Sequence, residues 1–555
     1  MTAIREKAAA PARGVAAADR SAAAAFYAER TAPVWVTTDG FTPRARHAMA
    51  EIAKADDWGL DARAFDLPRL PTTGSIPIPA LADAEVALSL AVLEYARHAR
   101  GGRLDPLQLS RNFDMKPPLR DPKAVMDDVA ATDAPGDYLR GLHPKHPQFQ
   151  LLRQALLKAR GESARPEEKT DLPARIPDGP TLKVGMRHPD VALLRKRLEL
   201  SGSAGDEELY DRDVQEAVKA FQRKSGVQVS GSLTGRTRSA LNAGSGTPPP
   251  SKGSEGQRIV VNMERWRWMP EHLGEFYVWN NIPEFQSRVV KAGRTIHQTK
   301  IIVGKPETQT AIFSADMRYI VFGPEWGVPD SIKVKEILPY LRPASDGFFG
   351  WSGGTDTRVL QRHNLRVSYN GRPVDASQVN WTQVDIRRFT FIQPPGPSNV
   401  LGAIKFRFPN KHDIYMHDTP QRNLFEQTTR AYSHGCIRTQ NPGRLAEILL
   451  EEDKGWSAGH VRQLYAQAGN NEVTLTKRIP VHNTYFTVFV GEDGRLQTFA
   501  DLYGHDQRVA SALGGRPMAL EEPSVASASP KEREVRRAPR YKQTSNDFFQ
   551  GLFGN

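Results

Sequence analysis

Cys436 is the residue best suited to covalent chemistry, and it is the single cysteine among 555 residues. His434 lies two residues before it and His417 nineteen residues before it, so two candidate bases are close in the chain. A thiol attacks as the thiolate, which needs a nearby base or cation. Gly435 permits a tight turn and the close backbone approach that an oxyanion hole needs. This combination predicts acyl transfer through a thioester.

The spacing of the two histidines does not by itself choose the base. His417 ends the strand-like run Ile414-Tyr415-Met416, from which its ring could reach a thiol on a neighbouring element. His434 would point to the same side as Cys436 in an extended segment, because side chains two residues apart share a face. Arg438, two residues after the thiol, could hold a substrate carboxylate and favour the thiolate, or form an ordinary salt bridge.

Other interpretations of this cysteine stay open. A lone cysteine is more often a small buried hydrophobic residue than a nucleophile. A zinc site could use His412, His417, His434 and Cys436, but their spacings are unusual for zinc and no second cysteine pair exists, which disfavours a zinc hydrolase. A papain-like peptidase is also disfavoured, because its nucleophile precedes its histidine in the chain and Cys436 follows His417.

The elements that must position these residues begin near residue 258. Turn residues separate short β-branched and aromatic runs, which predicts a mostly-β domain: Ile259-Val260-Val261-Asn262, Phe276-Tyr277-Val278-Trp279, Ile301-Ile302-Val303-Gly304, Tyr319-Ile320-Val321-Phe322 and Lys405-Phe406-Arg407-Phe408. A polar, glycine-rich stretch at about 335–395 interrupts them and is typical of a lid or a disordered segment. After the cysteine, Asn441 as N-cap and Pro442 in the first turn predict a helix.

The chain before residue 258 is expected to be mostly helical. Residues 1 to about 28 are alanine-rich, and we expect them to be disordered or loosely helical. Small and apolar residues recur at helical spacing over about 33–160, where the run 86–93 predicts a buried helix. Two linkers rich in proline, glycine, serine and charged residues flank a compact unit at about 182–242 that carries further helical patterns.

Composition limits the class of protein. The length predicts three or four domains, and 39% hydrophobic with 25% charged residues is ordinary for a globular protein. No apolar run approaches the roughly eighteen residues of a membrane span. The net charge of +12 favours an anionic partner, although no zinc-finger spacing or aromatic–basic pattern points to nucleic acid. Part of the charge lies in a basic C-terminal tail, where residues 531–542 hold six basic and two acidic side chains, and this tail could contact an envelope protein or a membrane or simply be disordered.

Cysteine usage and the N-terminal residues bear on the compartment. One cysteine excludes an intrachain disulfide, which fits a cytosolic protein or an exported one with a lone reactive thiol. The first residues lack the apolar core of a secretory signal. We therefore expect either that the signal is missing from this chain or that export follows another route.

Several motifs resemble the L,D-transpeptidase catalytic domain, also called the YkuD domain. The matching residues are His417 and the run Ser433-His434-Gly435-Cys436-Ile437. Arg438 stands where most members carry asparagine, which is similar to the large, multi-domain, YcbB-like branch. Further motifs of that branch are Gln393-Pro394-Pro395-Gly396-Pro397, Lys405-Phe406-x-Phe408-Pro409-Asn410 and Trp326-Gly327-Val328-Pro329. The resemblance extends over most of 258–500. The unit at 182–242 resembles the type-1 peptidoglycan-binding domain, and 33–160 looks like the scaffold domain of the same branch.

The resemblance implies roles for individual residues. It makes Cys436 the nucleophile, His417 the general base, Asp418 the residue whose backbone orients that base, and His434 a supporting residue. Backbone N–H groups near Gly435 and Cys436 are the expected oxyanion donors. The substrate-binding residues that it implies are Arg438, Ser433, Tyr415 and Trp326.

The resemblance also implies an activity. Family members join peptidoglycan stem peptides by 3–3 cross-links through a cysteine thioester, without a metal or organic cofactor, in the periplasm. Carbapenem-type β-lactams are expected to acylate the cysteine. The same site could act as an L,D-carboxypeptidase or attach a protein to the wall, and an inactive peptidoglycan-binding protein is the alternative from another class.

The expected fold is a multi-domain α+β protein with a helical scaffold domain, a small three-helix peptidoglycan-binding domain and a mostly-β catalytic domain with a lid insertion. The expected boundaries are 1–28 for the low-complexity N-terminus, 29–162 for the scaffold, 163–181 for a linker, 182–243 for the peptidoglycan-binding unit, 244–257 for a second linker, 258–505 for the catalytic domain and 506–555 for a disordered basic tail.

Overall fold

The computed structural model divides the chain into two compact units. One unit is formed by residues 1–153 with the described part of 261–555, and the other by the described part of 154–260. The residues that the structure describes are 1–10, 15–71, 75–163, 176–177, 179–198, 200, 206–224, 229–244, 252–341, 356–467, 469–491, 493–516 and 519–521. Most of the first linker, part of the lid and the end of the basic tail lie outside these residues.

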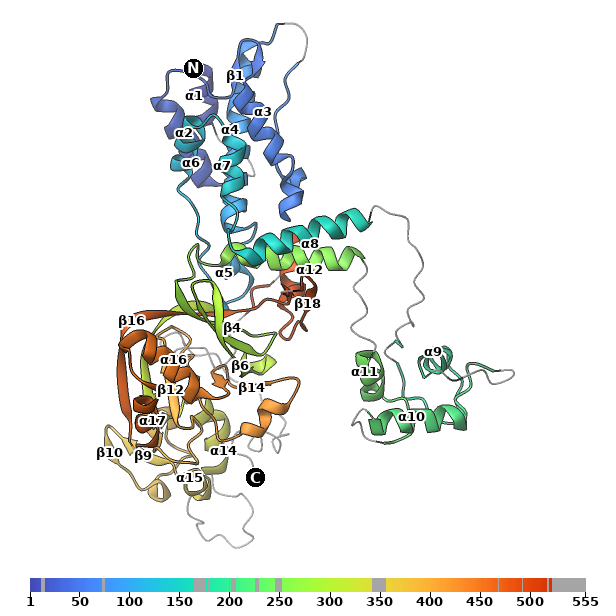
Figure 1. The fold of residues 1–555 in the computed structure, drawn as a ribbon, viewed down its shortest axis with the longest axis vertical. Helices are drawn as coiled ribbons and strands as arrows, with labels where there is room; N and C mark the ends of the chain where they lie inside the picture. Colours follow the sequence, from blue (N-terminus) through green and yellow to red (C-terminus); the bar gives the residue numbers. More distant parts are fainter. Residues whose placement is uncertain are drawn as a thin grey trace. The chain divides into compact units, whose positions relative to one another are not determined.

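The N-terminal region is helical, as the apolar spacing predicted (Figure 1). Its helices are α1 (Thr2–Ala9), α2 (Ala17–Glu29), α3 (Pro43–Ile52), α4 (Ile78–Gly101), α5 (Pro106–Leu109), α6 (Pro122–Ala131), α7 (Pro135–Gly141) and α8 (Pro147–Ser163), with short 3-10 turns at Ala55–Trp58 and Ala62–Ala64. Three short strands accompany them: β1 (Val36–Thr37), β2 (Gly40–Phe41) and β3 (Phe113–Asp114).

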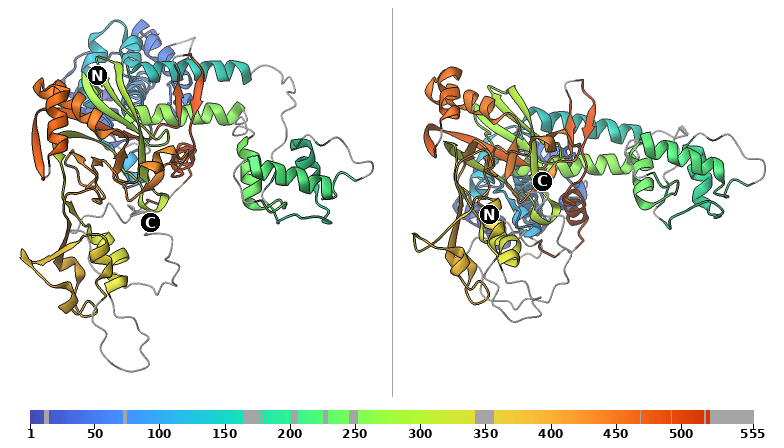
Figure 2. Two further views of the ribbon diagram at one scale, coloured as in Figure 1. Left: turned by 60° about the horizontal axis from the view of Figure 1, so that its bottom comes forward. Right: turned by 90° about the horizontal axis from the view of Figure 1, so that it is seen from below.

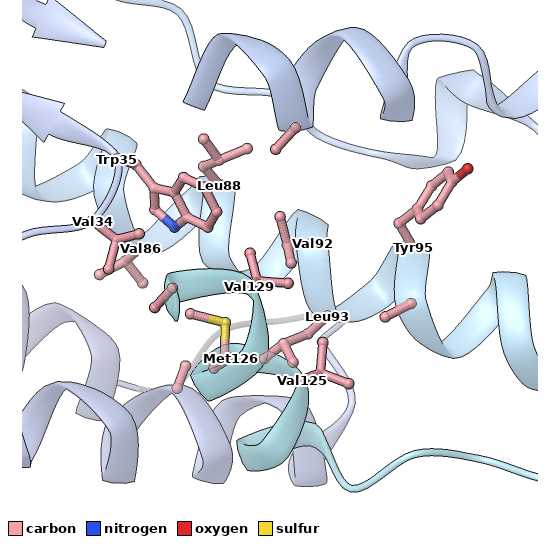
Figure 3. Close-up of a cluster of buried hydrophobic side chains, with 14 of the residues drawn as sticks. Val34, Trp35, Val86, Leu88, Val92, Leu93, Tyr95, Val125, Met126 and Val129 are labelled. Atoms are coloured by element: carbon pink, nitrogen blue, oxygen red, sulfur yellow. The ribbon is translucent and has the colours of Figure 1, made fainter. Parts of the chain in front are cut away.

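Helix α4 forms the centre of this region. Its run 86–93 is buried as predicted, and Figure 3 shows Val92 and Leu93 beside Val125 and Val129 of α6. The buried Glu85 carboxylate accepts backbone N–H groups from residues 34–36, at 2.6 to 3.0 Å. A buried carboxylate is stable only when hydrogen-bond donors surround it. These three hydrogen bonds therefore hold residues 34–36, which precede α3, against α4.

The described N-terminal residues are helical, which agrees with one of the two expectations, a helix, and not with the other, disorder. Helices α1 and α2 pack on the same core as α4, with Phe26 and Tyr27 almost fully buried. The alanine-rich composition therefore reflects close helix packing, because small side chains let helices approach one another.

The unit at about 182–243 has the predicted three helices, α9 (Pro189–Arg197), α10 (Arg212–Lys224) and α11 (Gly235–Gly244), drawn together in Figures 1 and 2. Val191, Tyr210 and Val218 are fully buried in its core. Gln222 joins the helices to the loop before α11, since its amide accepts the N–H groups of Ser230 and Gly231 at 2.9 Å.

Residues 252–268 are a helix, α12 (Lys252–Trp268), where the sequence suggested a linker followed by a strand at 259–262. A short β-branched run cannot be told from a buried helix by its pattern alone. Asn262 donates to Thr487 at 3.0 Å and Arg267 donates to the Trp58 carbonyl at 2.7 Å. These buried contacts on two sides of α12 override its local strand preference.

The region that follows α12 is built on one large sheet. Its strands are β4 (Phe276–Asn281), β5 (Gln286–Lys291), β6 (Arg294–Gly304), β7 (Ile312–Phe322), β12 (Ile404–Arg407), β13 (Met416–His417), β15 (Ile437–Thr439) and β16 (Asn471–Thr484). They pair in the order β12-β13-β15-β6-β5-β4-β16-β7, and β12 also pairs with β7, so the sheet closes on itself. Strand β14 (Ala431–Ser433) adds to β6, and β3 from the N-terminal region adds to β7.

The interruption predicted at about 335–395 is in part a small folded body. Its helices are α13 (Asp330–Ile332), a π-turn at Lys333–Ile337, α14 (Leu338–Leu341) and α15 (Arg358–Arg362), with 3-10 turns at Ala376–Gln378 and Ile386–Arg388. Its sheet has the order β10 (Arg372–Pro373), β9 (Arg366–Tyr369), β11 (Phe389–Gln393) and β8 (Trp326–Gly327). Trp381 and Phe391 are buried in a core of its own. The glycine-rich stretch at 342–355 lies outside the described residues.

The C-terminal part is more ordered than expected. Helix α16 (Pro442–Lys454) starts at Asn441 and Pro442 as predicted, and α17 (Ala458–Ala466), β17 (Val488–Val490) and β18 (Leu496–Thr498) follow. The expected disordered tail begins instead with a packed helix, α18 (His505–Leu513), in which Val509 is fully buried. Glu521 then pairs with the backbone of Leu109 and Arg111. Residues 522–555 lie outside the described part.

Candidate active site

A cavity of about 900 Å³ opens on one face of the closed sheet, and both Cys436 and His417 line it. Its walls come from the small folded body through Trp326, from β12 through Lys405, and from the turn 433–436. The structure thus brings the predicted nucleophile and the predicted base to one pocket.

Strand register explains why these side chains meet. His417 on β13 lies opposite Lys405 on β12 and opposite Arg438 on β15. Side chains directly opposite on paired strands share a face, and alternate residues share it too. The other face carries Phe406, Met416 and Ile437, which are completely buried inside the sheet. The alternation therefore directs Lys405, Tyr415, His417, Cys436 and Arg438 into the pocket.

Cys436 rests as a protonated thiol. Its Sγ donates a weak hydrogen bond to the Asp413 carbonyl at 3.7 Å, and the Tyr415 hydroxyl also hydrogen-bonds to it. Burial raises the pKa of the Cys436 thiol above its ordinary value, although Tyr415 and the Lys405 ammonium act in the opposite direction. The cysteine is partly exposed to the pocket, so a substrate can reach it.

His417 is held as a neutral imidazole in a defined tautomer. A carbonyl oxygen can only accept, so the 2.5 Å contact between His417 Nδ1 and the Asp418 carbonyl requires Nδ1 to donate. Nε2 then keeps the lone pair that a base needs. Burial, followed by the charge of Arg438, lowers the pKa of His417 to about 3. The ring is therefore uncharged at neutral pH.

The backbone carbonyl of Asp418 holds the His417 ring, and the carboxylate of Asp418 holds that stretch of backbone in place. The carboxylate accepts the Ala403 N–H at 2.9 Å and lies 3.6 Å from Arg422. Burial raises the pKa of the Asp418 carboxyl. Gly402 lies so close that a Cβ there would collide with the Asp418 side chain. This packing leaves the Asp418 carbonyl turned toward the His417 ring.

The turn at residues 433–436 is held by hydroxyl groups. Ser433 Oγ donates to the Cys436 carbonyl at 2.5 Å and accepts the Gly435 N–H at 3.1 Å. Gly435 has a φ of 112°, which favours glycine. Thr310 Oγ1 donates to the Gly435 carbonyl at 2.8 Å, which anchors the turn to the end of β6.

Two expectations for this turn need revision. The Gly435 N–H is already bound to Ser433, so it is not a free oxyanion donor in this structure. Within the described residues, the Cys436 N–H has no hydrogen-bond acceptor and is the better candidate. Ser433 lines the pocket, but its hydroxyl is used within the turn rather than offered to a ligand.

The remaining predicted residues lie around the same cavity. His434 Nε2 lies 3.2 Å from the buried Glu336 carboxylate, which ties the turn to the small folded body. Arg438 donates to Gln421 at 2.7 Å, and burial lowers the pKa of its guanidinium to about 10. Trp326 and Tyr415 form part of the pocket wall.

His412 pairs with an aspartate, Asp114, and not with the histidines and the cysteine that the zinc interpretation grouped with it. Its ring lies 3.2 Å from Asp114 of β3, and this contact lowers the pKa of the Asp114 carboxyl to about 2. Across the part of the chain that the structure describes, no group of three or more histidine, cysteine, aspartate or glutamate residues is arranged to hold a metal ion.

Sequence reasoning missed three cations in the pocket, Arg387, Lys405 and Arg407. Lys405 and Arg407 stand in the run Lys405-Phe406-Arg407-Phe408, which was interpreted as a strand and as part of a family motif but not as a source of pocket side chains. The alternation of basic and aromatic residues was the available signal, because it places both cations on the face opposite the buried aromatics. Thr310 and Glu336 were missed too, since only the folded chain brings them to the turn.

Comparison with known families finds three matching regions. Residues 275–468 match the family described as "L,D-transpeptidase catalytic domain". Residues 187–241 match the "Putative peptidoglycan binding domain" family, and residues 21–156 match the "Scaffold domain" family.

Individual relatives carry matching names. A protein of Haemophilus influenzae named "Putative L,D-transpeptidase" is 28% identical over 263 residues, which are 47% of this chain and 50% of the relative. The chain thus spans about half the length of that relative. An L,D-transpeptidase structure from Xylanimonas cellulosilytica has 14% identity and a TM-score of 0.15, covering 56% of this chain and 100% of its own. One from Stackebrandtia nassauensis has 12% identity and a TM-score of 0.14, covering 54% and 94%.

Proposed function

The chain carries an L,D-transpeptidase catalytic domain and a peptidoglycan-binding domain, and from this premise we propose that it forms 3–3 cross-links between peptidoglycan stem peptides through a thioester on Cys436. The observation that carries the proposal is the shared pocket of Cys436 and His417. The ring of His417 is held in the tautomer that a general base requires.

The first half-reaction is acylation. Cys436 Sγ attacks the carbonyl carbon of the third residue of a donor tetrapeptide while its proton passes to His417 Nε2. The tetrahedral intermediate then collapses, the bond to D-alanine breaks, and the proton on His417 goes to the leaving amine. Because both groups start neutral, charge separates only as the bond to sulfur forms. The Cys436 N–H would donate to the developing oxyanion.

The second half-reaction is aminolysis. The side-chain amine of a diamino acid on another stem attacks the thioester and His417 takes its proton. The C–S bond then breaks, and the departing Cys436 thiolate receives that proton from His417. Neither half-reaction requires a metal or an organic cofactor. Trp326 and Arg438 line the pocket next to the reacting groups and would hold the donor there.

The test is the formation of stem-peptide dimers from purified tetrapeptide fragments. We expect the full-length protein to yield dimers and a Cys436 acyl adduct detectable by mass spectrometry, and the Cys436→Ala variant to yield neither. Thermal melting shows whether the variant is folded. Equal dimer formation by the folded variant and the parent would end the proposal.

Water or another amine could reach the same thioester. Release of D-alanine without dimers would identify an L,D-carboxypeptidase, and transfer to a protein amine would identify wall attachment. An inactive wall-binding protein would form no acyl adduct at all. The partly exposed position of Cys436 is compatible with each acceptor, so the product distribution decides among them.

The proposed partners and location follow from the same chemistry. Carbapenem-type β-lactams should acylate Cys436, which intact-protein mass spectrometry would detect. We place the activity in the periplasm, where the substrate lies, and cell fractionation tests this. Within the described residues no helix is long and apolar enough to cross a membrane. The proposed contact of the basic tail with an envelope protein or membrane falls mostly on residues outside the described part, and a nucleic-acid partner is not proposed.

A further inference from the structure

Lys405 is a cation of the pocket that has no anionic partner. The other cations that line the cavity each have a polar partner: Arg387 has Asp385 at 2.8 Å, Arg407 has Glu472 at 2.5 Å, and Arg438 has Gln421 at 2.7 Å. Among the described residues, Lys405 Nζ forms neither a hydrogen bond nor an ion pair. The strand register nevertheless directs this ammonium into the pocket beside His417.

The surroundings of Lys405 are unusual for an unpaired ammonium. Its Nζ lies 3.8 Å from the centroid of the Tyr415 ring, and the side chain is half-buried. Burial lowers the pKa of Lys405, which means that the charged form is short of solvation. A cation–π contact recovers only part of that loss. The Asp413 and Glu472 carboxylates also act on the ammonium, but neither forms an ion pair with it, so Nζ remains available to an arriving anion.

The position of Lys405 relates it to the reacting sulfur. The Tyr415 hydroxyl hydrogen-bonds to Cys436 while the ammonium lies over the ring of the same tyrosine. An anion at Nζ would therefore lie one aromatic ring away from Sγ. It could bind there without displacing the contact between Tyr415 and the thiol.

We propose that Lys405 binds the C-terminal carboxylate of the residue that leaves the donor peptide, an inference that rests on the proposed function. That carboxylate belongs to the residue whose nitrogen departs, so it is the carboxylate nearest to the attacked carbonyl. When the attacked carbon lies at Cys436, the leaving residue lies across Tyr415 and its carboxylate meets Lys405. The subsite selects donors that end one residue after the attacked carbonyl, because a longer or amidated donor offers no negative charge there.

Two donors and three variants of the full-length protein test this subsite. The donors are a tetrapeptide stem with a free C-terminal carboxylate and the same stem with a C-terminal amide, each measured for release of the leaving residue. Loss of an ion-paired hydrogen bond is worth about 10- to 100-fold in kcat/KM. We expect Lys405→Met to lose about that factor on the acid and to leave the amide within a few-fold of the parent. Lys405→Arg should keep much of the preference.

The control is Lys291→Met. It removes an exposed lysine on β5 that pairs with Glu452 of α16, and this variant should keep the parent's preference. Equal losses on both donors, or none on the acid, would overturn the subsite while leaving the proposed function intact. A parent protein that acts on neither donor would overturn the proposed function and the subsite with it.

A second measurement separates binding of a carboxylate from support of the thiolate. Iodoacetamide is uncharged, so its rate of reaction with Cys436 reports the thiolate and not the carboxylate subsite. We expect Lys405→Met to label within a few-fold of the parent. A labelling rate that falls as much as turnover on the acid donor would assign Lys405 to the sulfur and overturn the subsite.

Discussion

At the scale of single residues, the pair of Cys436 and His417 rests without charge. The sequence suggested a thiolate primed by an imidazole, whereas burial raises the pKa of the thiol and lowers that of His417 to about 3. A raised thiol pKa means less thiolate at pH 7 than in a free cysteine, and a lowered histidine pKa means a neutral ring down to acidic pH. The proton must therefore move during attack on the substrate.

This resting state predicts a distinctive labelling profile. Iodoacetamide should react with Cys436 at pH 7 more slowly than with free cysteine, and the rate should rise as the pH passes the ordinary thiol value of 9.0. His417→Gln should leave that profile unchanged, because a neutral imidazole does not support the thiolate. The same variant should lose about 10²–10⁴-fold in kcat/KM, as expected when a general base is removed.

The control is His460→Gln, an exposed histidine on α17, which should label and react like the parent. Labelling at pH 7 that is faster than for free cysteine, and that slows in His417→Gln, would show a thiolate–imidazolium pair instead.

The sequence predicted the chemistry of the site better than it predicted the complete set of residues that form the site. A lone cysteine after glycine, with histidines close in the chain, is visible in any printed sequence. Lys405 comes to the pocket through the pairing of β12 with β13 and with β7, and β7 is distant from β12 in the chain. The partner of His434 could not be foreseen either, because Glu336 reaches it from the small folded body.

At the scale of elements, the turn at residues 433–436 is joined to the end of β6 by the hydroxyl of Thr310. Thr310 Oγ1 accepts the Gly304 N–H at 2.9 Å and donates to the Gly435 carbonyl at 2.8 Å. Thr310→Val would leave both buried groups unpaired, at a cost of about 1–3 kcal/mol each. We expect a lower melting temperature and a kcat that falls more than KM rises, because the turn shifts the sulfur rather than the substrate.

Thr310→Ser keeps the hydroxyl and should restore most of kcat, which a purely steric role of the threonine methyl would not allow. Thr476→Val, which removes an exposed hydroxyl near Lys454, serves as the control for the substitution itself. A full kcat in folded Thr310→Val would show that the turn holds its shape without this contact.

The small folded body should support the pocket wall that it contributes. Trp381 is buried in its core and donates to the Ala376 carbonyl at 2.9 Å, while β11 pairs with β8 and so holds Trp326. Trp381→Ala should destabilise this body by about 3–5 kcal/mol. Hydrogen exchange should then rise over 356–393, and kcat/KM should fall because Trp326 loses its support.

The matched control is Trp456→Ala, a tryptophan between α16 and α17 that is not part of the pocket, and it should keep kcat/KM. Unchanged exchange over 356–393 in Trp381→Ala would contradict the dependence of this body on its own core.

Long, regular patterns predicted their elements reliably, whereas short runs gave mixed results: the runs at 276–279, 301–304 and 319–322 and most of 405–408 form strands as predicted, and the run at 259–262 does not. The run 86–93 in α4 repeats the helical period over many residues, and its burial followed from that. The run 259–262 offered four residues that suit a strand, and only its partners in the folded chain make it a helix. The tail was judged by its basic residues at 531–542, which lie outside the described residues, and that charge carried no information about α18, where Val509 is buried.

At the scale of the whole molecule, the peptidoglycan-binding unit folds around a core of its own. Val218 is fully buried there, so Val218→Asp would place an unpaired carboxylate in an apolar interior and unfold that unit. We expect binding to purified peptidoglycan sacs, measured by co-sedimentation, to be lost. Turnover of soluble tetrapeptide fragments should remain, since the catalytic residues belong to the other compact unit.

Arg212→Asp on the exposed face of the same helix is the control and should keep both properties. Loss of soluble turnover together with sac binding in Val218→Asp would mean that the catalytic unit depends on this one for its stability.

Strand β3 determines where the chain can be shortened without exposing the edge of the large sheet. Phe113 and Asp114 pair with the start of β7, and the Phe113 ring packs at 4.5 Å against His505. A fragment that starts near residue 275, where the family match begins, would lose this strand. It would expose unpaired backbone N–H and C=O groups of β7, which can pair with strands of other molecules. A minimal soluble enzyme therefore has to be cloned from upstream of residue 110, or supplied with the missing peptide in trans.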